Sequence, residues 1–244
     1  DPWVQKIVAA TCGNLYKPLI DNLSSYPIPE LRLPPGNGDI FLELGCNWGR
    51  WLIAAAQKGY RPIGIDPSLE AALSAQRVAA QLDLHIGIVV ADARYLPFTS
   101  AAMDVVFSYS VLQHFSKTSA VLAMQEAGRV LRPGGTSLIQ MPNRYGIRSI
   151  YNLARRGFSE GSAFDVRYWT LPELRRTFDQ AIPGHTTISV DGYFGLGIQA
   201  TDKPLLPRHY QVIISASETL RKLSLHFPFM KLLADSLYIL TVKG

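Results

Sequence analysis

The chain has 244 residues and carries 24 Lys and Arg against 19 Asp and Glu, a formal net charge of +5. Hydrophobic residues make up 48% of it and charged residues 18%, which excludes a disordered chain, a coiled coil and a collagen. No run of five or six like charges occurs, so a nucleic-acid partner is not expected. No apolar stretch reaches the roughly 18 residues that a membrane-spanning helix needs.

The two cysteines, Cys12 and Cys46, form neither a CxxC pair nor a Cys/His cluster. The sequence therefore predicts no disulfide framework and no metal site. A reducing, cytoplasmic compartment fits this cysteine usage best, and no signal-peptide pattern opens the chain. The first residue is Asp1 and not methionine, which leaves an upstream leader or domain open.

The N-terminal region differs in sequence pattern from the rest of the chain. Apolar residues recur at helical spacing over residues 2–25, and the proline-rich stretch from Pro27 to Gly36 then predicts a linker. We expect residues 1–36 to form a helical lid and linker, and residues 37–244 to form the main domain.

From residue 39, short apolar runs alternate with helical patterns. The expected strands cover residues 39–44, 62–65, 85–91, 103–108 and 136–141, and the expected helices 49–59, 68–82 and 118–131. Strands that are apolar on both faces and alternate with helices are typical of a parallel sheet covered on both sides. The sequence predicts an α/β, Rossmann-like, doubly wound fold.

After Pro142 the pattern loosens, and we expect insertions at about 143–170 and 195–235. Between them, residues 171–181 read as a helix with Thr170 and Glu173 in capping-box positions, and residues 186–194 read as a strand. A helix over 210–225 and a last strand over 237–242 complete the chain. The two final strands predict an antiparallel hairpin that closes the edge of the sheet.

Each of the first three expected strands delivers one acidic residue to the same end of the sheet. These residues are Glu43, Asp66 and Asp92. Ligands of open α/β sheets bind at the carboxyl ends of the strands. Three carboxylates there suit a ligand with an amine and a ribose diol, and they repel a pyrophosphate.

The turn after the first strand narrows the choice of ligand. Gly45 allows a sharp turn, and Asp66 follows it by about twenty residues, the spacing of a carboxylate that binds ribose hydroxyls. A dinucleotide fingerprint would need glycines where Asn47 and Arg50 stand, which disfavours an NAD-dependent oxidoreductase. Asn tolerates left-handed backbone angles, so Asn47 can preserve the turn.

Five segments occur here in a familiar order and spacing. They are residues 43–50 (ELGCNWGR), 64–68 (GIDPS), 91–107 (ADARYLPF with MDVVF), 110–114 (SVLQH) and 129–135 (RVLRPGG). With these segments the chain resembles the class I S-adenosylmethionine-dependent methyltransferases, in particular the small-molecule type that includes quinone-biosynthesis enzymes. The resemblance covers residues 39–141 and extends more loosely to the C-terminus.

The resemblance implies S-adenosylmethionine as cofactor and a mostly parallel seven-stranded sheet whose last pair is antiparallel. It implies that Asp66 binds the ribose hydroxyls and that Asp92 accepts from the adenine amine. The implied cofactor-binding residues are Glu43, Gly45, Cys46, Asn47, Gly49, Asp66, Pro67, Asp92, Ala93, Ser108 and Gln113. One departure from the family is Asn47, where a glycine is usual, and we expect the bulky Trp48 to cover one side of the site.

The acceptor side is less specific. His114 follows the fourth strand and is the candidate catalytic base; the alternative is a helix-end histidine bonded to backbone. The candidate acceptor-binding residues are Arg144, Tyr145, Tyr168 and Trp169. Arginines beside aromatic rings suit an anionic or sugar-like acceptor, although a surface insertion would show the same composition.

Apolar and basic residues are mixed in the 195–235 insertion, which is compatible with contact to a membrane surface or with a cap packed on the core. The sequence predicts a cytoplasmic methyltransferase that acts at oxygen or carbon of a small-molecule or lipid-linked acceptor. The alternatives are a non-catalytic methyltransferase-fold partner subunit and an NAD-dependent oxidoreductase. The oligomeric state stays open.

Overall fold

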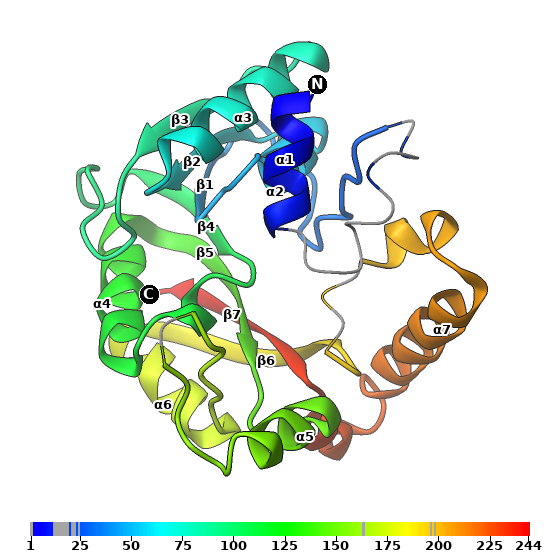
Figure 1. The fold of residues 1–244 in the computed structure, drawn as a ribbon. Coiled ribbons are helices and arrows are strands. Elements are labelled where there is room, and N and C mark those ends of the chain that lie inside the picture. Colours follow the sequence, from blue (N-terminus) through cyan, green and yellow to red (C-terminus); the bar gives the residue numbers. More distant parts are fainter. Residues whose placement is uncertain are drawn as a thin grey trace. The chain divides into compact units, whose positions relative to one another are not determined.

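The computed structural model describes residues 2–11, 20, 23, 25–162, 164–195, 197 and 199–244. Figure 1 shows the chain coloured along its sequence. The chain divides into two compact units. The first unit comprises Asp1–Ala93 and Gly197–Ile214, and the second comprises Arg94–Leu196 and Ser215–Gly244.

Three parallel strands form the centre of the first unit. They are β1 (Ile40–Leu44), β2 (Arg61–Asp66) and β3 (Gly87–Val90), which pair in the order β1, β2, β3 and are accompanied by α2 (Arg50–Gln57) and α3 (Leu69–Gln81). A Cβ at Gly64 would lie 2.5 Å from a Leu52 methyl carbon and 2.7 Å from Cys46, so α2 packs directly against β2. The expected elements are confirmed, with β3 shorter than the expected strand over 85–91.

The N-terminal helix packs on this unit. Helix α1 (Pro2–Thr11) contacts α3, and its buried Val4 and Val8 share a cluster with Ile53 and Val78. The helix predicted over residues 2–25 is too long, because residues 23 and 25 are not helical. Residues 12–19, 21, 22 and 24, with Cys12 among them, lie outside the described residues.

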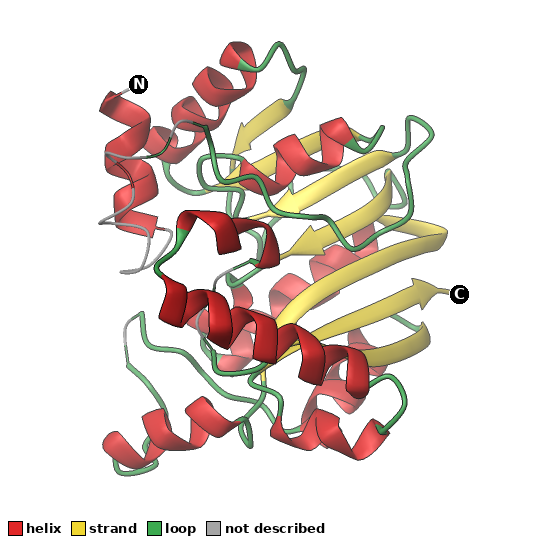
Figure 2. Cartoon of the chain, turned by 90° about the vertical axis from the view of Figure 1, so that its right-hand side faces the viewer, coloured by secondary structure: helices red, strands yellow, loops and turns green. Residues whose placement is uncertain are grey.

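The second unit contains the other four strands. They are β4 (Met103–Ser108), β5 (Leu131–Pro142), β6 (Gly184–Gly192) and β7 (Ser236–Lys243). Strand β4 is parallel to β5, while β7 runs antiparallel to both β5 and β6 and leads to the C-terminus (Figure 2). The seven strands follow the order β3-β2-β1-β4-β5-β7-β6. The predicted seven-stranded sheet with an antiparallel C-terminal hairpin is therefore confirmed.

Seven further helical elements are described in the two units. The remaining helical elements are η2 (Leu112–His114), α4 (Lys117–Val130), α5 (Ile147–Arg155), α6 (Leu171–Ala181), η3 (Ala200–Leu205), α7 (Arg208–Leu223) and η4 (Pro228–Leu233). In α6 the predicted capping box is present, because Thr170 and Glu173 each accept from the other's backbone N–H.

Two expectations from sequence need correction. Strand β5 begins at Leu131 and not at residue 136, because Met103 pairs with Leu131 before the register shifts and Val105 pairs with Thr136. Between these two pairs, Arg132, Pro133 and Gly134 are exposed and Gly135 is buried. Helix α5 lies in the stretch 143–170 for which no regular period was expected, because several of its large apolar side chains face solvent and not a core.

Candidate active site

The site residues of the first unit lie where β1 and β2 end. Asp66, the last residue of β2, is 9% exposed, and its two oxygens accept from different segments. Oδ2 accepts from the Asn47 N–H at 2.9 Å and Oδ1 from the Ser68 N–H at 2.9 Å. The carboxylate is thus fixed by the loop after β1 and by the start of α3. Each oxygen keeps a second lone pair that can accept from a hydroxyl.

Glu43 in β1 is the more unusual of the two carboxylates. It is 2% exposed, and its Oε2 has no hydrogen-bond partner among the described residues. Burial raises the pKa of Glu43 well above its usual value, and the negative charge of Asp66 raises it further. The Leu52 N–H and the Arg50 charge oppose this shift in pKa. A buried carboxylate oxygen without a donor is suited to a cationic ligand.

The turn between β1 and α2 requires left-handed backbone. Gly45, Asn47 and Gly49 have φ angles of 74°, 48° and 84°. The prediction that Asn47 can stand in for glycine is confirmed, and its Oδ1 also accepts from the Trp48 N–H at 2.7 Å. A Cβ at Gly49 would approach the Ala75 Cβ to 3.0 Å, so α3 crowds this end of α2. The loop therefore presents backbone rather than side chains to a ligand.

Two further residues of this loop are buried. Burial, together with the negative charges of Glu43 and Asp66, raises the pKa of the Cys46 thiol well above its usual value, so the group stays uncharged. Trp48 is 1% exposed and packs in the cluster of α1, with its ring centroid 5.8 Å from that of Tyr26. The Trp48 side chain therefore packs against the N-terminal region. The sequence alone predicts that it covers one side of the site.

The third acidic residue follows β3. The Ala91 N–H donates to the Asp66 carbonyl oxygen at 3.2 Å, which holds the chain after β3 against the end of β2. Asp92 is half-buried, Ala93 is buried and Pro67 is exposed. The nine cofactor-binding residues predicted from β1 to Ala93 therefore occupy the carboxyl ends of β1, β2 and β3 and the loops that follow them.

A buried ion pair adjoins this group and was not predicted. Arg50, the first residue of α2, lies 3.4 Å from Asp202 of η3, and the Asp202 carboxylate is 1% exposed. Asp202 also accepts from the Gln199 N–H at 3.2 Å. The pair fixes η3 to the start of α2. No local sequence signal marks Asp202, because its partner is about 150 residues away in the chain.

In the second unit, the predicted residues surround the end of β4. Ser108 ends that strand and is buried, and Gln113 and His114 lie in η2. His114 Nδ1 is 2.7 Å from the Phe164 carbonyl oxygen, and the two rings stack with centroids 4.4 Å apart. The carbonyl can only accept, so Nδ1 carries the proton and Nε2 accepts from Gln113 at 3.2 Å. A hydrogen bond to a backbone carbonyl is what the alternative interpretation of His114, a helix-end histidine bonded to backbone, predicts.

The surroundings of His114 keep it neutral. Burial lowers the pKa of His114, and the Arg167 charge lowers it further, while the Phe164 carbonyl and Asp165 oppose the shift in pKa. Arg167 is 9% exposed and donates to the carbonyl oxygens of His114 at 2.8 Å and of Asp165 at 2.7 Å. Arg167 therefore ties residues 164–168 to η2, a role that the sequence did not reveal.

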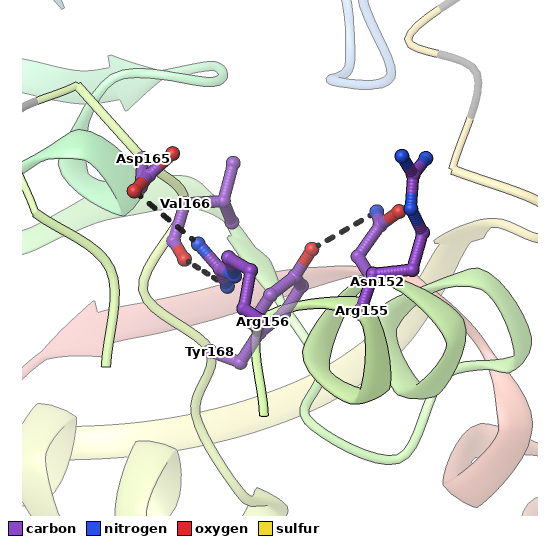
Figure 3. Close-up of a pocket in the computed structure, with 6 residues that line it drawn as sticks. All are labelled: Asn152, Arg155, Arg156, Asp165, Val166 and Tyr168. Carbon is purple, nitrogen blue, oxygen red and sulfur yellow. Dashed lines mark hydrogen bonds and ion pairs between the residues drawn. The ribbon is translucent and has the colours of Figure 1, made fainter. Parts of the chain in front are cut away.

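A cavity of about 330 Å³ lies beside the same segment. It is lined by Asn152, Arg155, Arg156, Asp165, Val166 and Tyr168 (Figure 3). Arg156 lies 5.4 Å above the Tyr168 ring, donates to the Val166 carbonyl oxygen at 3.1 Å and approaches Asp165 to 3.8 Å. Figure 3 shows the Arg156 guanidinium directed toward Asp165 and Val166, and the Arg155 guanidinium apart from this group on the other side of Tyr168. Two cations and one carboxylate give the lining a net positive charge.

Of the four predicted acceptor-binding residues, only Tyr168 lines this cavity. Trp169 is buried, lies under the Lys117 ammonium at 5.0 Å and accepts at its carbonyl oxygen from the Arg144 N–H. Tyr145 is exposed. The roles predicted for Arg144, Tyr145 and Trp169 stay predictions.

No group of three or more His, Cys, Asp or Glu side chains among the described residues could hold a metal ion. Among the helices that the structure describes, none is long and apolar enough to cross a membrane.

Part of the chain is similar in sequence to known methyltransferases. Residues 41–135 match the model of a methyltransferase domain. A protein of Mycolicibacterium smegmatis named as a probable S-adenosylmethionine-dependent methyltransferase is 31% identical over 103 residues, which are 42% of this chain and 38% of that protein. The 27-O-demethylrifamycin SV methyltransferase of Amycolatopsis mediterranei is 35% identical over 106 residues, which are 42% of this chain and 38% of that protein. The chain thus matches well under half the length of these curated relatives.

Solved structures extend the similarity beyond the matched segment. One is a complex between the Haloferax volcanii Trm112 methyltransferase activator and a methyltransferase, with a TM-score of 0.61 and 19% identity. The similarity covers 100% of this chain and 95% of that chain. At this level of identity the likeness concerns the fold.

Proposed function

We propose that this chain is a class I S-adenosylmethionine-dependent methyltransferase, which the matched domain and the M. smegmatis relative support. Its acceptor is a small-molecule or lipid-linked compound that carries an anionic group and is methylated at oxygen or carbon. Its cofactor is S-adenosylmethionine. The observation that carries the proposal is the buried Glu43 Oε2, which lacks a donor among the described residues beside the fixed Asp66 carboxylate. These two groups match the ammonium and the ribose diol of that cofactor.

The cofactor-side residues bind and orient. In this proposal Glu43 accepts from the ammonium group, Asp66 from the ribose hydroxyls and Asp92 from the adenine amine. Gly45, Cys46, Asn47 and Gly49 border the methionine part with backbone, and Pro67 and Ala93 border the adenine. Bound S-adenosylmethionine supplies a methyl group that is already activated. The protein then contributes mainly position and electrostatics.

The acceptor-side residues position the group to be methylated. A neutral His114 has one acceptor nitrogen, Nε2, and Gln113 donates to it. If the acceptor is a hydroxyl, Gln113 must release His114 Nε2, which then takes the hydroxyl proton as the oxygen attacks the methyl group and the bond from that group to the cofactor sulfur breaks. Gln113 and Ser108 orient cofactor or acceptor at the end of β4. A carbon acceptor that is already an anion would need no base.

The positively charged cavity supports an anionic acceptor. Arg155 is stacked beside Tyr151 at 5.7 Å, and no described carboxylate forms an ion pair with it. Arg156 Nε is buried without a hydrogen-bond acceptor among the described residues. A carboxylate or phosphate would satisfy this donor and balance the charge of the lining. The segment that lines the cavity is also the one that bonds to His114.

Calorimetric titration with S-adenosylmethionine and S-adenosylhomocysteine tests the cofactor side. We expect micromolar binding of both and no binding of NAD. Acceptors are then offered in matched pairs, with and without a carboxylate or phosphate, and transfer is followed by the appearance of S-adenosylhomocysteine. Arg155→Gln should raise KM for the anionic member of a pair and leave its neutral partner unchanged.

The same experiments separate the alternatives. Cofactor binding without transfer to any acceptor would favour the non-catalytic partner subunit. NAD binding in place of S-adenosylmethionine would favour the oxidoreductase and reject the proposal. We expect the protein to act in the cytoplasm, which localisation of a tagged full-length chain would test.

A further inference from the structure

The most exposed apolar segment of the second unit follows α7. Six large apolar side chains within residues 223–233 are between 42% and 67% exposed. They are Leu223, Leu225, Phe227, Phe229, Leu232 and Leu233. The ring centroids of Phe227 and Phe229 are 6.2 Å apart. Large apolar side chains gathered in this way on a protein surface mark an interaction site.

A second exposed apolar row lies at the start of α5. Its members are between 44% and 57% exposed: Tyr145, Ile147, Ile150 and Tyr151. Polar contacts join it to the first row. Asn143 Nδ2 donates to the carbonyl oxygens of Leu232 at 2.9 Å and of Ala234 at 2.8 Å. Asp235 Oδ1 accepts from the Ser149 N–H at 2.9 Å.

The two rows therefore belong to one surface. A Cβ at Gly146 would lie 2.5 Å from the Asp235 Cα, so the two backbones are in direct contact. Figure 1 shows α5 beside the orange-red segment between α7 and β7, which contains η4. We call this surface, formed by residues 144–155 and 222–233, the basic apolar face.

The charges of this face have one sign. Residues 143–158 and 219–234 contain no Asp or Glu. Their basic residues are Arg144, Arg148, Arg155, Arg156, Arg221, Lys222 and Lys231. Arg221 is paired with Glu218, and Arg156 approaches Asp165. The adjacent Asp235 is buried and bonded to backbone. The remaining cations surround the apolar side chains with positive charge.

We infer that the basic apolar face docks on an anionic lipid surface. Apolar and aromatic side chains that insert among acyl chains, together with cations that meet anionic headgroups, are what interfacial membrane binding requires. A second copy of the chain is a poorer occupant, because an isologous contact would place like cations against each other. The inference goes beyond the proposed function, because docking needs neither cofactor nor acceptor.

Vesicle co-sedimentation of the purified chain tests it. We use vesicles of phosphatidylcholine alone and vesicles that also contain phosphatidylglycerol. Binding is expected to the anionic vesicles only, and added salt should weaken it. Phe229→Asp with Leu232→Asp should lower the affinity by more than about tenfold, since both side chains lose apolar burial. Lys222→Gln and Lys231→Gln should each lower it about fivefold.

Leu122→Asp is the matched control, because Leu122 on α4 is 40% exposed and lies outside the face. This variant should bind vesicles like the wild type. Circular dichroism and titration with S-adenosylmethionine show that each variant is folded. Absence of binding to anionic vesicles, or equal binding by the Phe229→Asp, Leu232→Asp variant, would overturn the inference. A dimer in sedimentation equilibrium that only this double variant disrupts, without vesicle binding, would assign the face to a second copy instead.

Discussion

Replacing Glu43 by Gln separates stability from cofactor binding. Glu43 is 2% exposed and its raised pKa shows that its burial penalises the charged form. Gln has the same shape and no charge. We therefore expect Glu43→Gln to stabilise the chain without cofactor at neutral pH and to weaken the binding of S-adenosylmethionine. Opposite signs for the two effects are the signature of a residue placed for a ligand.

The magnitude of the binding effect follows from the bond that is lost. A hydrogen bond to a charged group contributes about 1.5–3 kcal/mol, so its loss should raise Kd by roughly tenfold to 150-fold. The pH dependence has a definite sign. Between the unfolded and the raised folded pKa of Glu43, the folded chain without cofactor holds more protons than the unfolded chain, so its stability falls as pH rises. An ammonium ligand needs the ionised form, so affinity should rise with pH up to that folded pKa.

Two assays check these expectations. Urea unfolding from pH 4 to 8 should show that the stability gain of Glu43→Gln is present at neutral pH and vanishes at the acid end. Calorimetry over the same range should show that Glu43→Gln removes the pH dependence of cofactor binding. Glu160→Gln, at an exposed position, is the control and should change neither. A wild-type affinity that is independent of pH and equal to that of Glu43→Gln would refute the reasoning.

Three further predictions concern the same loops and the acceptor side. Asp66→Ala leaves two loop N–H groups without their acceptor, so calorimetry should show cofactor binding weakened at least about tenfold and urea unfolding a loss of about 2 kcal/mol. Gly49 has a φ of 84° and a Cβ there would contact Ala75, whereas Gly134 has a φ of 74° and open space around it. Gly134→Ala should therefore lower the unfolding free energy by about 1–2 kcal/mol, and Gly49→Ala should lower it more. If the acceptor is a hydroxyl, His114→Asn should leave cofactor affinity unchanged and lower kcat. The wild-type kcat should then rise with pH around the pKa of His114, which lies below 6.5. Equal kcat values for wild type and His114→Asn would reject His114 as the base.

The strand ends and the turn of the first unit could be predicted because their signals are local. A buried strand, a turn that needs left-handed residues at Gly45, Asn47 and Gly49, and a carboxylate at the next strand end all lie within a short stretch. Parallel strands bring their carboxyl ends to one edge, so these positions converge without any knowledge of packing. The identity of Asn47 as a left-handed residue followed from the same local rule.

The remainder depends on contacts between distant residues. Asp202 meets Arg50 across about 150 residues of sequence, and Arg167 reaches back to η2, so neither has a local signature. Trp48 and Trp169 were predicted to border the site, and the structure buries both, Trp48 in the cluster of α1 and Trp169 under the Lys117 ammonium. The neighbours that bury them are not evident from the local sequence. Side-chain direction follows from which partner offers apolar surface.

By itself, the sequence determined the order of strands and helices, the glycine-containing turn and the acidic residue at each of the first three strand ends. Hydrophobic period and turn chemistry act over a few residues, so the linear order suffices to read them. Only the tertiary structure decided that Glu43 keeps an oxygen without a donor among the described residues, that the two arginines line one cavity, and that two apolar stretches form one basic face. Burial and juxtaposition depend on packing between segments far apart in the chain, and no local pattern encodes that packing.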